Sequence, residues 1–75
     1  MPVVGSMYRL TLAGRALPNL YRFEGEEPQH CQLHGEYIRQ LWLFRKRRNS
    51  EKRPWGSVHS YVADNPDLQV ELVSS

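Results

Sequence analysis

The chain of 75 residues contains a single cysteine, Cys31. An intramolecular disulfide is therefore excluded, and the cysteine usage favours a reducing, cytoplasmic compartment. No apolar run approaches the roughly 20 residues that a membrane helix needs, so we expect no membrane partner. The N-terminus lacks a basic head followed by an apolar stretch, so no secretory signal is expected. A Gly-rich phosphate loop and a Walker-type lysine are also absent.

The chain is short, which limits the size of its core. A domain of this length buries roughly 60% of the surface that its unfolded chain exposes, so dense aromatic packing or a partner has to help. Hydrophobic residues make up 40% of the chain, with two Trp, four Tyr and two Phe, which is sufficient for a folded domain. We expect one small domain over residues 7–75. Residues 1–6 are expected to be a flexible N-terminus, and Gly5-Ser6-Met7 fits a cloning junction with Met7 as the native start.

The net charge of +2 hides a strong polarisation along the chain. Residues 1–39 carry four Arg and four Glu, so their formal charges cancel. Residues 40–56 carry six cations against Glu51, whereas residues 57–75 carry three acids and no cation. This distribution predicts one local electropositive patch and argues against a uniformly basic protein.

Alternating residue types predict two strands in the N-terminal third. Tyr8, Leu10 and Leu12 alternate with polar residues over 8–12, which is the pattern of a half-buried strand. A turn is predicted at Leu17-Pro18-Asn19, and a second short strand at 20–24. The two strands are expected to pair as an antiparallel hairpin across a loop of about seven residues.

The segment 36–47 fits two structures. Tyr37, Ile38, Leu41, Trp42 and Phe44 recur at helical spacing, yet Tyr, Ile, Trp and Phe also favour sheets. The Arg, Gln and Leu residues favour a helix, and the cations that follow suit a helix C-terminus. We therefore predict a helix over 36–47, and a helix start at Glu26-Glu27-Pro28.

The C-terminal half is predicted to contain a basic loop at 45–56, strands at 58–62 and 68–73, and a turn at 64–67. Together these elements predict an α+β fold: a small single domain with a short antiparallel sheet of three to four strands, packed with one helix.

The basic stretch is the strongest candidate for a binding site. Cations attract phosphates regardless of sequence, and neighbouring aromatic rings stack on unpaired bases. The predicted site for nucleic acid or another partner consists of Arg45, Lys46, Arg47, Arg48, Lys52, Arg53, Trp55 and Trp42. In the alternative interpretation the loop carries only solvated charge, Trp42 and Phe44 fill the core, and Trp55 anchors the loop.

Metal and catalytic chemistry have weaker support. His30, Cys31, His34 and His59 are weak zinc candidates, but their spacing matches no usual structural site, so we expect no metal and no cofactor. Cys31 with His34 or His59 resembles a thiolate–imidazole pair, yet no third group to orient it is identifiable. A chain this small rarely encloses a substrate pocket, so we do not expect an enzyme.

These observations predict a small non-enzymatic regulatory protein. Its basic patch would dock on RNA, on single-stranded DNA or on an acidic surface of a nucleic-acid machine such as RNA polymerase, acting by occlusion or bridging. Such a size is typical of accessory factors, including those that phages make to redirect a host enzyme. The alternative is a protein–protein inhibitor or adaptor that binds an acidic protein surface without contacting nucleic acid. The sequence leaves the oligomeric state open.

Overall fold

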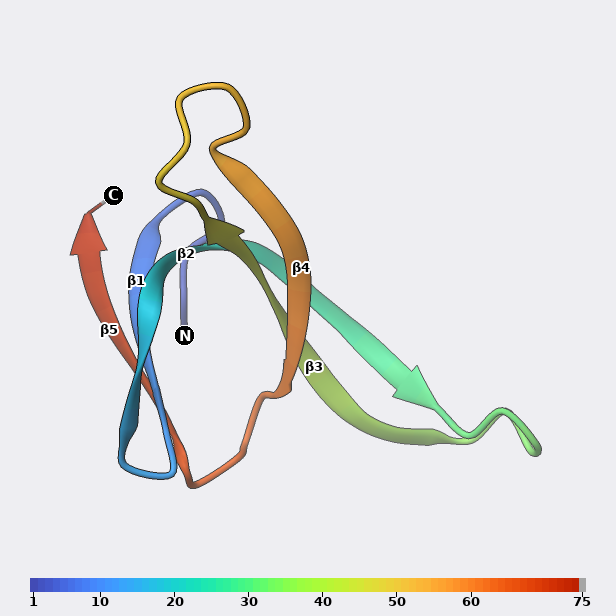
Figure 1. The fold of residues 1–75 in the computed structure, drawn as a ribbon. Helices are drawn as coiled ribbons and strands as arrows, with labels where there is room; N and C mark the ends of the chain where they lie inside the picture. The colour runs from blue at the N-terminus through green and yellow to red at the C-terminus, as the bar shows by residue number, and fades with distance from the viewer. Residues whose placement is uncertain (75) are drawn as a thin grey trace.

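The computed structural model describes residues 1–74, which form one open antiparallel sheet (Figure 1). The sheet has five strands in the order β4-β3-β2-β1-β5. Their bounds are β1 Met7–Leu12, β2 Arg15–His30, β3 Tyr37–Arg47, β4 Trp55–Val62 and β5 Leu68–Ser74. No helix occurs in residues 1–74, so the predicted α+β fold is wrong: the domain is all-β.

The predicted helix over 36–47 is strand β3. It pairs with β2 on one side and with β4 on the other, so its backbone groups are used by two neighbours. Phe44 is fully buried and Trp42 packs on the same face, which is the two-residue period of a strand. Aromatic and β-branched residues pack well between two strands, and this long-range pairing outweighs the helix preference of the Arg, Gln and Leu residues. The predicted helix start at Glu26-Glu27-Pro28 is also wrong, because these residues lie within β2.

The pairing of β1 with β2 is confirmed, but its turn is shorter than predicted. Ala13 and Gly14 connect the strands, with φ angles of 51° and 80°. Two residues at positive φ match the type I′ turn that suits a twisted hairpin. The predicted turn at Leu17-Pro18-Asn19 is instead a bulge in β2, where three residues face Leu10 of β1. Proline is tolerated there because a bulge releases its position from the ladder.

The core lies on one face of the sheet. Its buried side chains are Tyr8, Leu10, Tyr21, Phe23 and Phe44, and the Phe23 and Phe44 ring centroids are 5.2 Å apart. The sheet curves around this face, and the N-terminal segment lies inside the curve (Figure 1). Three hydrogen bonds connect that segment to the core: Gly5 N donates to Phe23 O, Phe23 N donates to Ser6 O, and Val3 N donates to the Tyr8 hydroxyl.

The distal halves of β2 and β3 form a projecting two-stranded arm, defined here as residues 26–40 (Figure 1). The β1–β2 pairing ends at Arg22 and the β3–β4 pairing ends at Leu41, so the arm has no further strand beside it. Leu33, Tyr37 and Ile38 are exposed on it. The arm extends from Gly25, a bulge residue with φ of 123°, where β2 changes register against β3.

The C-terminal elements follow the sequence prediction. The predicted strands at 58–62 and 68–73 are confirmed as parts of β4 and β5. The turn between them is also confirmed: Asp67 N donates to the Asn65 side chain at 2.9 Å, and Leu68 N donates to Asn65 O at 3.1 Å. β5 then pairs with β1, placing Val70 opposite Leu10, next to the core.

Candidate nucleic-acid interface

The predicted basic loop forms the end of the β3–β4 hairpin. The connection itself is shorter than the predicted 45–56, because Arg45 to Arg47 belong to β3 and Trp55 begins β4. It is closed by a hydrogen bond from Arg48 N to Pro54 O at 2.6 Å. We call the cations gathered here the basic end: Lys46, Arg47, Arg48, Lys52 and Arg53. All of these except the half-buried Lys46 are exposed.

Strand alternation distributes the basic end over both faces of the hairpin. Arg47 pairs with Trp55 on the face opposite the core, whereas Lys46 lies two residues from Phe44 and shares its face. Arg48 lies beside Lys46: a Cβ added at Gly56 would be 3.1 Å from Arg48 Nε and 3.5 Å from Lys46 Cβ. The missing side chain at Gly56 therefore lets two cationic side chains lie across β4.

Arg45 has a structural role that separates it from the other predicted cations. Its Nε donates to Glu24 Oε1 at 2.6 Å, and its Nη1 donates to Gly56 O at 3.0 Å. Arg22 donates to both oxygens of the same carboxylate, at 3.1 and 3.2 Å. The hydrogen bonds from Arg22, and then the single hydrogen bond from Arg45, hold the pKa of Glu24 below its ordinary value of 4.5. Arg45 thus joins β2, β3 and β4, and it shares the Glu24 carboxylate with Arg22.

Trp55 lies against two guanidinium groups. The Cζ atom of Arg22 is 3.9 Å from the ring centroid, and that of Arg47 is 4.9 Å away. Both distances are typical of cation–π contacts. Arg22 is not distinguished by any motif in the sequence, and only the β2–β3 register brings it beside a residue at the start of β4. The predicted partners Arg47 and Trp55 are therefore brought together, with Arg22 added.

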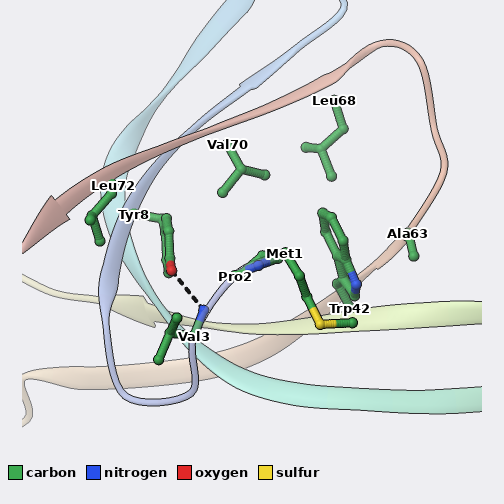
Figure 2. A pocket seen from close by; sticks show the side chains of 9 residues that line it. All are labelled: Met1, Pro2, Val3, Tyr8, Trp42, Ala63, Leu68, Val70 and Leu72. Atoms are coloured by element: carbon green, nitrogen blue, oxygen red, sulfur yellow. Dashed lines mark hydrogen bonds between the residues drawn. The ribbon is translucent and has the colours of Figure 1, made fainter. Parts of the chain in front are cut away.

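The structure does not bring Trp42 to the basic end. Trp42 packs against Phe23, with ring centroids 6.2 Å apart, and lines a cavity of about 440 Å³ on the concave face (Figure 2). It lies about 16 Å along β3 from Arg47. The other lining residues are mostly apolar and include the N-terminal segment: Met1, Pro2, Val3, Tyr8, Ala63, Leu68, Val70 and Leu72.

The weak metal candidates are distributed over two places. His30, Cys31 and His34 lie at the tip of the arm, whereas His59 lies in β4 with its ring centroid 6.1 Å from that of Tyr21. Within residues 1–74, no group of three or more His, Cys, Asp or Glu side chains is placed to share a metal ion. The described chain also contains no helix that could span a membrane.

Comparisons with protein families, with curated proteins and with solved structures find no match to this chain. The candidate interface is therefore described by its geometry and its charge.

Proposed function

We propose that this protein is a non-enzymatic binding protein whose basic end docks on nucleic acid. One observation carries the proposal. The five cations of the basic end have no ion-pair partner in the part of the chain that the structure describes, whereas Arg22 and Arg45 share Glu24. Five unpaired cations against the single nearby acid Glu51 create a strong local attraction for polyanions.

Phosphate groups suit this surface because they are regularly spaced anions along a flexible chain. Each phosphate that a Lys or Arg neutralises releases condensed counterions, and this release drives binding without base specificity. With cations on both faces of a narrow hairpin end, the protein contacts successive phosphates from two sides. Binding of this kind regulates by occluding the nucleic acid or by bridging it to another molecule.

The test is a titration of the purified protein with short RNA, short single-stranded DNA and duplex DNA at about 50 and 200 mM salt. We expect the logarithm of the binding constant to fall linearly with the logarithm of salt concentration. The double variant Arg47→Glu/Arg48→Glu should lose most of the affinity. The matched control is Arg15→Glu/Arg39→Glu, which makes the same charge change at two exposed arginines outside the basic end and should lose much less.

Failure of all three nucleic acids to bind at low salt would refute the proposal. A protein–protein inhibitor or adaptor is then the second candidate, favoured by the arm and its exposed Leu33, Tyr37 and Ile38. Exposed apolar residues of this kind mark protein contacts when they gather on one element. Binding to an acidic protein surface, such as that of RNA polymerase, would then be abolished by Leu33→Ser/Ile38→Ser.

A further inference from the structure

Trp55 differs from the aromatic side chains of the core in what surrounds it. Trp42 packs against the buried cluster, whereas Trp55 lies on the opposite face, half-buried among arginines. An indole in this position contributes little to the core. Its ring lies beside the basic end, at the place where a bound polyanion would pass.

The two arginines at the ring are held differently. The guanidinium of Arg22 is fixed by two hydrogen bonds to Glu24. Arg47 is exposed, and no carboxylate of residues 1–74 pairs with it. Arg47 can therefore leave the ring without breaking an ion pair, whereas Arg22 stays and keeps the indole oriented.

A nucleobase is a stronger partner for the ring than Arg47. Stacking of one base on an aromatic side chain contributes about 5- to 150-fold in affinity. An exposed cation–π contact contributes only about 2- to 5-fold. Replacing Arg47 by a base is therefore favourable, and the released guanidinium becomes free to bind a phosphate.

We infer that the basic end binds single-stranded nucleic acid, RNA or DNA, with one unpaired base stacked on Trp55 in place of Arg47. This inference rests on the proposed function and adds the class of nucleic acid to it. Arg47 and the loop cations Lys52 and Arg53 contact the phosphates that flank the stacked base. A duplex keeps its bases paired and stacked inside, so it contacts the cations alone.

The experiment uses Trp42→Phe protein, in which Trp55 is the only tryptophan. Short RNA, short DNA of the same sequence and a long duplex are titrated separately at about 50 mM salt while tryptophan fluorescence is recorded. We expect at least one single strand to quench Trp55 strongly and the duplex to leave it nearly unchanged. Adding Trp55→Leu removes the last tryptophan, so affinities for single strand and duplex are compared from the anisotropy of dye-labelled nucleic acid. This variant should lose about tenfold in single-strand affinity and less than about twofold in duplex affinity. Adding Trp55→Phe, which retains an aromatic face, should restore most of the loss.

Duplex affinity serves as the internal control for folding, together with the melting temperature of the Trp55→Leu variant. Equal losses of single-strand and duplex affinity would overturn the inference, and so would tight single-strand binding without quenching. In both cases the proposed function would stand, because binding would persist through the phosphates. Absence of all binding at low salt would refute the inference and the proposed function together.

Discussion

The side-chain amide of Asn19 donates a hydrogen bond to the backbone oxygen of Arg47 at 2.9 Å. Asn19 belongs to the bulge in β2, and Arg47 is the last residue of β3. The bulge in β2 is therefore hydrogen-bonded to the last residue of β3, which is one of the cations of the basic end. An irregularity that looks like a simple turn in the sequence holds part of the candidate interface in place.

Asn19→Ala should lower the free energy of unfolding modestly, because it removes this one exposed hydrogen bond. We expect a loss of about 0.5–1 kcal/mol in urea denaturation. Asn49→Ala is the matched control, since Asn49 is exposed in the β3–β4 connection and should have almost no effect on stability. Equal effects of the two substitutions would show that the Asn19 bond contributes nothing.

Glu24→Gln should destabilise the domain at neutral pH, because Arg22 and Arg45 would lose their shared counter-charge. The site is partly exposed, so solvent screening limits the expected loss to about 1 kcal/mol. Glu27→Gln, at an exposed position of the arm, should change stability by less. Thermal and urea unfolding at neutral pH compare the two variants.

The Glu24 carboxylate should also make the stability of the domain depend on pH in the acid range. The pKa of Glu24 in the folded protein lies below its ordinary value of 4.5, so the charged form is favoured by folding. Its contribution to stability is fully present above about pH 4.5 and is lost as pH falls through the lower folded pKa. Wild-type protein should therefore lose more stability than Glu24→Gln in this window. Parallel pH profiles would contradict the assignment.

Ala13→Asn should stabilise the β1–β2 hairpin. Ala13 has a φ of 51° at the first position of a type I′ turn, and Gly14 follows with φ of 80°. Asn adopts positive φ more readily than Ala, and Asn-Gly is the preferred pair for this turn. We expect a gain of about 0.5 kcal/mol, measured as a higher melting temperature. Ala16→Asn, within β2, is the control and should not stabilise.

A chain that begins at Met7 should be less stable than the full chain. It loses the three hydrogen bonds that Val3, Gly5 and Ser6 make with Tyr8 and Phe23, which amount to about 3 kcal/mol together. It also uncovers Trp42, which lines the cavity beside Met1 (Figure 2), so its fluorescence should shift to the red. Unchanged stability and an unchanged spectrum would show that residues 1–6 contribute nothing to the fold.

Local patterns in the sequence were sufficient for the strands whose two faces differ. The alternation at 8–12 reflects one face on the core and one in water, whereas in 68–73 only Leu68 and Val70 are half-buried and Leu72 is exposed; both strands are present in the structure. The pattern failed at 36–47, because Trp42, Leu43 and Phe44 are consecutive apolar residues that fit a helix and a buried strand equally well. The pairing of β3 with β2 and β4 decides between them, and this pairing cannot be read from the residues of 36–47 alone.

The position of the candidate site in the fold was predictable to the same extent, whereas its function stays a prediction. The cations and Trp55 stand together in the sequence, so the basic end could be located. The contact of Arg22 with Trp55, and the use of Arg45 to hold Glu24, depend on the register between β2 and β3. The sequence shows that the cations are close together, whereas the register between β2 and β3 decides which of them form ion pairs.

The strand order also bears on how the domain folds. Three of the four strand pairings join neighbours in the chain, and only the pairing of β1 with β5 brings the two ends together. The hairpins can therefore form early from nearby contacts, while β5 must wait for the largest loop closure. Once docked, β5 has a single strand beside it. Its backbone amides should exchange with solvent deuterium sooner than those of β2, and its detachment should be the first step by which the native sheet opens.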